Sequence, residues 1–80
     1  MPVTYYVALP FMDSEDGPVP GEPTECHSPN GAMSSALSLS RKEGNVGAVA
    51  FSRTGDPALG DFADALVIKT FGEVPREFAS

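Results

Sequence analysis

Apolar residues alternate along the first part of the chain in the spacing typical of a β-strand. Within residues 4–11, one face would carry Tyr5, Val7, Leu9 and Phe11. Successive side chains of a strand point to opposite faces, so this spacing predicts a strand with one continuous apolar side. Residues 12–20 are rich in acidic residues, glycine and proline and predict a loop. Residues 22–26 predict a short second strand, which would close a wide hairpin.

A helical spacing replaces the alternation after residue 28. Ser28 can supply a capping hydroxyl, and Pro29 suits the first helical position because its missing N–H would have no partner there. The apolar residues that then fall within one arc of a helix are Ala32, Met33, Ala36, Leu37 and Leu39. Gly44 can end the helix in the left-handed conformation. The pattern therefore predicts a helix over residues 29–43.

Strand spacing returns in the last third of the chain, at residues 45–53 and 62–71, with a hairpin loop at residues 54–61. Residues 72–80 lack a pattern and predict a flexible tail. The order of elements is then β-β-α-β-β. This order predicts an α+β fold in which a four-stranded antiparallel sheet carries one helix on one face, as a two-layer sandwich. We expect one small domain over residues 1–80.

The sheet face opposite the helix is also predicted to be apolar. Its residues would include Val49, Phe51, Val67 and Phe71. One helix cannot cover both faces, and four such exposed side chains would leave a patch that is large for a monomer. A homodimer through this face is the simplest cover. The alternative is that the loop and the tail fold back over it, with Met12, Val74 and Phe78 as lids.

The charge balance is acidic, with 11 Asp and Glu against 5 Lys and Arg and a formal net charge of −6. Nucleic acids and anionic membranes attract clustered cations, and only Arg41 and Lys42 are adjacent. We therefore expect neither a nucleic-acid nor a membrane partner. Apolar runs inside the chain, such as residues 65–68, are far shorter than the about 20 residues of a membrane helix. The lone Cys26 cannot form an internal disulfide, which favours a cytoplasmic location.

Few residues suggest catalysis. Cys26 and His27 are the only thiol and imidazole of the chain. Adjacent residues on a strand point to opposite faces, so these two would not form a nucleophile–base pair. Zinc prefers four ligands, and the chain has no second Cys or His. We therefore predict a protein that is not an enzyme and that uses no metal and no cofactor.

The densest polar cluster comprises Ser52, Arg53, Thr54, Gly55 and Asp56. A guanidinium and hydroxyl groups beside a glycine turn can bind an anion, so this cluster is a candidate ligand site. The same residues are also typical of an ordinary hairpin, in which Asp sets the turn and Gly supplies a positive φ. The sequence leaves both interpretations open.

Three stretches of the sequence resemble a family of short bacterial hypothetical proteins. They are residues 4–11 (TYYVALPF), residues 47–57 (GAVAFSRTGDP) and residues 71–75 (FGEVP). The resemblance covers most of the chain. That family has no assigned activity, so the resemblance implies no catalytic residue, and we expect from it only that the chain is a complete natural protein.

These observations together predict a small cytosolic protein-interaction module that forms a homodimer and has a further, unidentified protein partner. One alternative is a small-molecule or anion-binding protein, or a minor enzyme, that uses the hairpin at residues 52–56. A second alternative is an acidic inhibitor that mimics nucleic acid. That role would require the carboxylates to line one surface.

Overall fold

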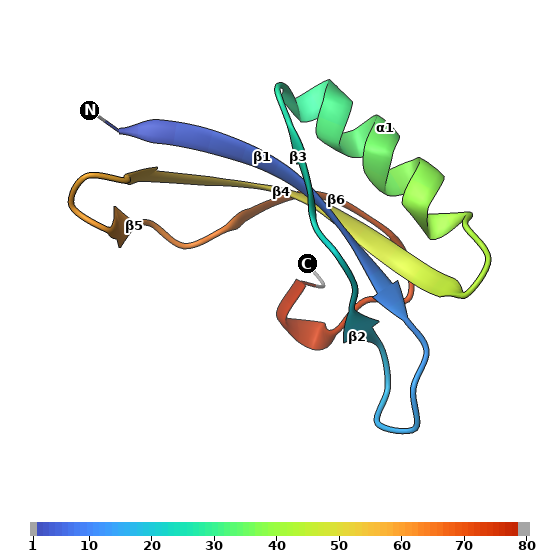
Figure 1. Cartoon of the computed structure of the whole chain (residues 1–80). Coiled ribbons are helices and arrows are strands. Elements are labelled where there is room, and N and C mark those ends of the chain that lie inside the picture. The colour runs from blue at the N-terminus through green and yellow to red at the C-terminus, as the bar shows by residue number, and fades with distance from the viewer. Residues whose placement is uncertain (1, 79–80) are drawn as a thin grey trace.

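The computed structural model describes residues 2–78, apart from the side chain of Glu77, and has an α+β fold (Figure 1). One helix lies on a curved antiparallel sheet of six strands. The elements are β1 (Val3–Met12), β2 (Val19–Pro20), β3 (Thr24–Cys26), α1 (Pro29–Ser40), β4 (Asn45–Asp56), β5 (Asp61–Phe62), β6 (Leu66–Gly72) and a 3-10 helix (Arg76–Phe78). The predicted α+β class with one helix is confirmed.

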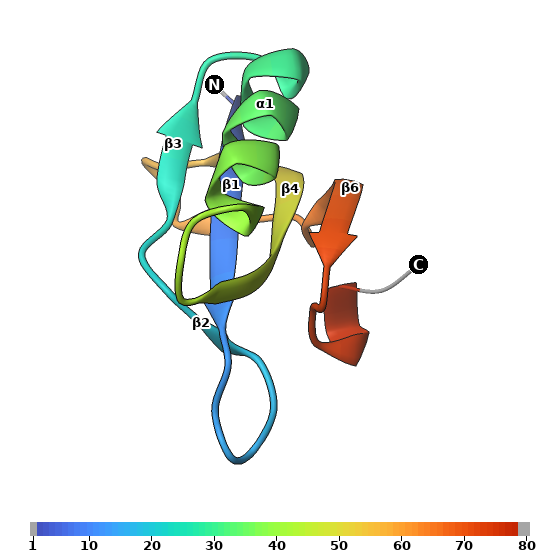
Figure 2. The ribbon, with the colours of Figure 1, turned by 90° about the vertical axis from the view of Figure 1, so that its right-hand side faces the viewer.

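Two long strands form the centre of the sheet. β1 and β4 pair antiparallel from Val3 opposite Gly55 at one end to Met12 opposite Asn45 at the other. β2 and β3 pair with β1 on its outer side, and β5 and β6 pair with β4 on its outer side. Figure 2 shows α1 in front of β1 and β4, with β3 and β6 at either side.

The strand count differs from the predicted four. β2 lies within the segment predicted as a loop, and β3 is shorter than the strand predicted over residues 22–26, since Pro23 has no N–H to pair. The strand predicted over residues 62–71 is divided, because residues 63–65 leave the ladder between β5 and β6. β4 continues to Asp56, through the first part of the predicted hairpin loop. The observed order is therefore β-β-β-α-β-β-β.

The start of α1 is as predicted, and its end is not. Ser28 caps the helix by accepting a hydrogen bond from the Gly31 N–H at 2.9 Å, and Pro29 is the first helical residue. The helix ends at Ser40, three residues before the predicted end. The Leu39 carbonyl near the helix end accepts from the Lys42 N–H at 3.2 Å and from the Asn45 side chain at 2.8 Å. Gly44 has a φ of 91° and shapes the turn into β4 instead of closing the helix.

Small side chains let α1 lie close to the sheet. The buried cluster on this side contains Ala8, Ala32, Ala36, Ala48 and Ala50. Phe71 packs against this cluster, so its predicted place on the opposite face is wrong. The reason is a bulge in β6: the pairing shifts so that Phe71 lies opposite Ala48 whereas Val67 lies opposite Phe51. One extra residue in a strand moves every later side chain to the other face.

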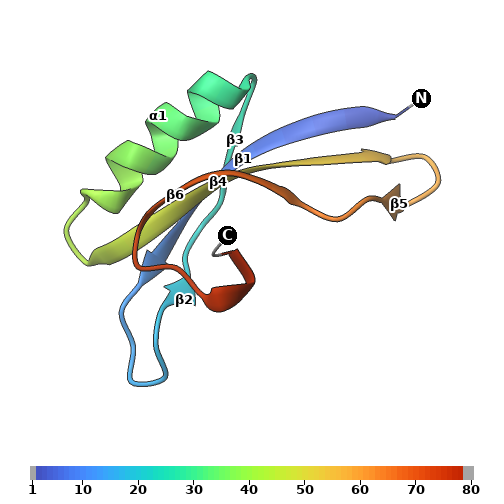
Figure 3. The same cartoon turned by 180° about the vertical axis from the view of Figure 1, so that it is seen from behind.

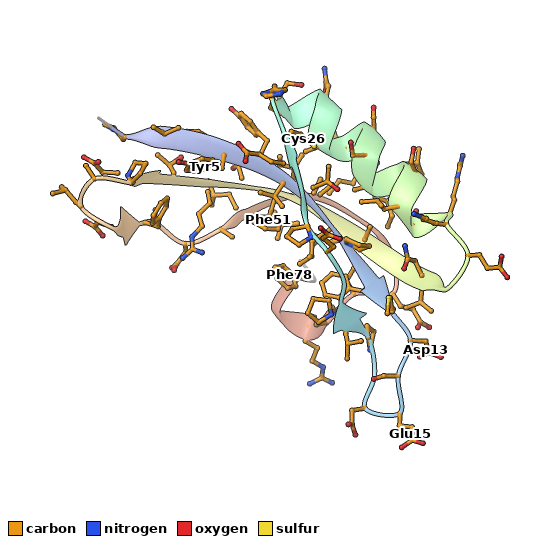
Figure 4. The ribbon with its side chains drawn as sticks, viewed as in Figure 1. Tyr5, Asp13, Glu15, Cys26, Phe51 and Phe78 are labelled. Atoms are coloured by element: carbon orange, nitrogen blue, oxygen red, sulfur yellow. The ribbon has the colours of Figure 1, made fainter. Side chains whose placement is uncertain are left out.

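The opposite face of the sheet is partly covered by the chain's own C-terminal segment. The ring of Phe78 lies 5.6 Å from that of Phe11 and 6.1 Å from that of Phe51, measured between centroids. Figure 3 shows the 3-10 helix and α1 on opposite sides of the sheet, and Figure 4 shows Phe51 and Phe78 on the side away from Cys26. Phe11 and Val49 are fully buried beneath this cover. The lid expected at Phe78 is therefore present at this end of the face.

Glycines allow the tail to cross the sheet. A Cβ atom on Gly47 would collide with the backbone of Glu73, and Gly72 has a φ of 68°. The Glu73 N–H donates to the Val46 carbonyl at 2.9 Å, which fixes the crossing. Residues 79 and 80 of the predicted flexible tail lie outside the described residues, and its flexibility stays a prediction. None of the described helices is long and apolar enough to span a membrane.

Candidate interaction surface

One end of the β1–β4 pair projects beyond the helix, and we call it the arm. It comprises residues 3–5 of β1 and residues 53–62, which form the end of β4, a turn and β5. Figure 1 shows the arm extending past the N-terminal end of α1. The molecule is correspondingly elongated, with principal extents of 39 × 25 × 21 Å.

Exposed apolar side chains gather on the arm and at the adjoining start of β6. Among the described residues, seven large apolar side chains are exposed, and five of them lie here: Val3, Leu59, Phe62, Leu66 and Val67. Leu59 is 77% exposed and Leu66 is 69% exposed. Scattered apolar side chains are common on protein surfaces, whereas a gathered group marks a site of interaction.

An aromatic ring and a guanidinium organise one face of the arm. Phe62 pairs with Gly55, and its ring lies across β4 at this position. A Cβ atom at residue 55 would collide with the ring, so the ring can lie there only because residue 55 is a glycine. The Phe62 ring centroid lies 6.0 Å from that of Tyr5 and 5.7 Å from Cζ of Arg53. Nε of Arg53 donates to the carbonyl of Ala63 at 3.1 Å. Sequence reasoning did not join Tyr5, Arg53 and Phe62 into one cluster, because their contacts depend on how β1, β4 and β5 pair.

Strand pairing continues this cluster along the sheet. Tyr5 lies opposite Arg53, and two residues along β4 Phe51 lies opposite Val67. We define the open face as the surface formed by Tyr5, Phe51, Arg53, Phe62 and Val67. It borders the part of the sheet that Phe78 covers, since the Phe51 ring also contacts Phe78.

The residues predicted for self-association are divided by the structure. Phe51 and Val67 lie on the open face, where Val67 is 37% exposed. Val49 is on the same face but is fully buried. Phe71 lies on the helix side. The open face is therefore displaced toward the arm relative to the predicted patch, and Tyr5 and Phe62 replace the two residues that are unavailable.

The predicted ligand-binding residues do not converge. Residues 52–56 lie within β4, so their side chains alternate between the two faces. The Thr54 hydroxyl is 2.8 Å from that of Thr4, on the face opposite Arg53. Asp56 accepts a hydrogen bond from the Ala58 N–H at 3.0 Å, and the positive φ of this turn belongs to Gly60 instead of Gly55. The hydroxyls and the guanidinium therefore cannot bind one anion together.

The remaining polar groups of the described residues lie apart from one another. The Cys26 thiol lies 3.6 Å from the Ser35 hydroxyl and His27 is exposed. Within residues 2–78 no group of three or more His, Cys, Asp or Glu side chains is placed to hold a metal ion. A surface hollow of about 430 Å³ lies between the C-terminal end of α1 and the segment before β3, and Glu22, Lys42 and Glu43 are among the residues that line it. It presents no nucleophile–base pair.

The outer strands β3 and β6 carry features that oppose strand addition, and the outer strands β2 and β5 have only two residues each. β3 has three residues and follows Pro23, and its middle residue is Glu25. β6 contains the bulge beside Lys69. Short edges, prolines, charges and bulges all prevent pairing with another chain. Association by extension of the sheet is therefore disfavoured, and the open face is the better candidate surface.

Comparison of the chain with family models, with curated proteins and with solved structures returned no match. The resemblance to the short bacterial proteins therefore stays a prediction. A functional proposal for this chain depends on the geometry of the arm and of the open face.

Proposed function

We propose that this protein is a small, non-catalytic interaction module that forms a homodimer through its open face. The observation that supports it best is the accessible surface of the chain, which is 5370 Å². Compact monomers of 8.4 kDa expose about 4600 Å². The excess of about 750 Å² is close to the about 800 Å² that each partner contributes to a standard protein–protein interface.

The molecule is also less compact than its length requires. Its Cα radius of gyration is 12.7 Å, against about 11.6 Å for a compact domain of 80 residues. The arm is one of two parts that project, the other being the loop between β1 and β2, and the arm with the adjoining start of β6 carries five of the seven large apolar side chains that are exposed among the described residues. Covering the open face and the arm in a dimer would remove this surface from water.

A second copy is the occupant that the surface favours. A two-fold dimer closes an apolar patch on itself and leaves no free patch for further addition. If about 60% of the covered area is apolar, the two copies together gain about 20 kcal/mol from burial, against an association cost of about 4–15 kcal/mol. In this assembly each protomer is a two-layer arrangement of helix and sheet, and the second copy supplies the missing third layer.

The other predicted functions have less support. Anion binding at residues 52–56 would need the hydroxyls and the guanidinium on one face, and they lie on two. An acidic surface that mimics nucleic acid would need aligned carboxylates, and Arg53 interrupts the open face. A further protein partner and a cytoplasmic location stay predictions.

Sedimentation of the purified chain tests the dimer, with a matched pair of variants. Val67 on the open face and Val19 on β2 are both 37% exposed, so Val67→Lys and Val19→Lys make the same chemical change at equal exposure. We expect a species of twice 8.4 kDa for the unmodified chain and for Val19→Lys, and a monomer for Val67→Lys, because a second cation on the face that carries Arg53 would be buried unpaired. A monomer of unmodified chain at hundreds of micromolar would contradict the proposal.

A further inference from the structure

We propose that in the homodimer the guanidinium of Arg53 binds the carboxylate of Asp64 from the second copy, and that this pair forms twice across the two-fold axis. The inference rests on the proposed self-association and deepens it. It assigns the polar contact that sets how the two copies are aligned.

The guanidinium of Arg53 is held in place but incompletely paired. Its Nε donates to the Ala63 carbonyl at 3.1 Å, and its Cζ lies 5.7 Å from the Phe62 ring centroid. These two contacts fix the plane of the group. A guanidinium has five N–H donors, and among the described residues only Ala63 accepts from it. The remaining donors, on the two Nη atoms, face solvent from an exposed side chain.

Covering the open face would take this guanidinium out of water. A buried cation without an acceptor is strongly unfavourable. A carboxylate that accepts from both Nη atoms satisfies the group with the geometry that arginine favours. The surface that covers Arg53 must therefore supply a carboxylate.

Asp64 is the carboxylate of the arm region best placed for this role. Asp56 and Asp61 pair with each other beside the Gly55–Phe62 pair, so their side chains point to the face away from Arg53. Asp64 is exposed and directly follows Ala63, whose carbonyl holds Arg53. The residue that holds the donor and the residue that carries the carboxylate are therefore neighbours in sequence, and no ion pair joins Arg53 and Asp64 within one chain among the described residues. A two-fold axis passing beside them would bring each Arg53 to the Asp64 of the other copy.

A charge-reversal cycle tests the pair through the dimer dissociation constant from sedimentation. We expect Arg53→Asp and Asp64→Arg each to weaken the dimer by about thirtyfold or more, and the double variant to recover most of the affinity. Asp61→Arg makes the same reversal on the other face of the arm and should change affinity less than about threefold. Circular dichroism of each variant checks the fold. If Arg53→Asp does not fold, the dissociation constant of the Asp64→Arg dimer tests the pair by itself. Asp64 is exposed and lies outside the strands, so its substitution should leave the fold intact.

The possible failures can be distinguished. A dimeric unmodified chain whose affinity is unchanged in Asp64→Arg, or whose double variant is as weak as the single ones, would overturn the Arg53–Asp64 pair and leave the homodimer standing. A monomeric unmodified chain would overturn both proposals.

Discussion

Two residues of the arm fit together because one of them lacks a side chain. The Phe62 ring lies where a Cβ atom of residue 55 would be, and the ring in turn supports Tyr5 and Arg53. Gly55 has no positive φ, so its backbone conformation does not require a glycine. The glycine is required because it leaves room for the Phe62 ring. The organisation of the open face therefore depends on a glycine that the sequence alone would assign to a turn.

Substituting this glycine should disturb the arm and spare the helix. We expect Gly55→Ala to displace the Phe62 ring and to lower the free energy of unfolding by about 1–3 kcal/mol, as overpacking usually does. Backbone amide shifts from NMR would report changes at residues 3–5 and 53–63, with little change in α1. An arm whose shifts match those of the unmodified chain would show that the Phe62 ring does not lie across residue 55.

The N-terminal cap of α1 is a second prediction at the residue scale. Ser28→Ala removes the oxygen that accepts from Gly31 and should lower the free energy of unfolding by about 1 kcal/mol. Ser34→Ala is the matched control, because Ser34 is exposed within α1 and alanine has the higher helix propensity. Urea unfolding measures both. Equal midpoints for the two variants would mean that the cap contributes nothing.

At the scale of elements, the C-terminal segment acts as a partial cover of the sheet. Gly47 and Gly72 let it cross β4, and Phe78 then packs on Phe11 and Phe51. The 3-10 helix that carries Phe78 has three residues and little structure of its own, so this ring contact is what holds the segment against the sheet. The cover ends where the open face begins.

Removing the ring distinguishes a packed segment from the flexible tail that the sequence predicts. We expect Phe78→Ala to lower the free energy of unfolding by about 2 kcal/mol, less than for a fully buried phenylalanine because Phe78 is half-buried. Val74→Ala, in the same segment and also half-buried, is the control and should cost less, since it removes fewer atoms. An unchanged urea midpoint for Phe78→Ala would support the flexible tail.

At the scale of the whole molecule, the structure has more surface than its mass requires. The arm is a two-stranded extension without a helix over it, and isolated hairpins are marginally stable in water. Association through the open face would stabilise the arm as well as bury it. Folding and self-association should therefore be coupled.

This coupling predicts a thermal midpoint that depends on protein concentration. We expect the midpoint to rise by a few degrees over about a hundredfold increase in concentration, because a partner that binds only the folded chain stabilises it. Calorimetry of the unmodified chain and of Val67→Lys provides the comparison, and the variant should show a constant midpoint. A constant midpoint in the unmodified chain would argue against a dimer that forms in this range.

Local interactions account for what the sequence by itself determined. The cap at Ser28 and Pro29 involves neighbours within three residues, and the alternation of residues 4–11 is a property of one strand, so both were predictable. The α+β class and the apolar character of both sheet faces followed from the same local patterns.

Contacts between distant segments account for the rest, which only the tertiary structure decided. The bulge in β6 depends on its pairing with β4 and moves Phe71 to the helix side. The crossing at Gly47 depends on Glu73, and the space at Gly55 is filled by Phe62. In none of these pairs do both partners belong to the same strand or helix, so the periodicity of a single element does not record them. The position of the open face depends on all three, because register and chain crossing choose which apolar residues remain exposed.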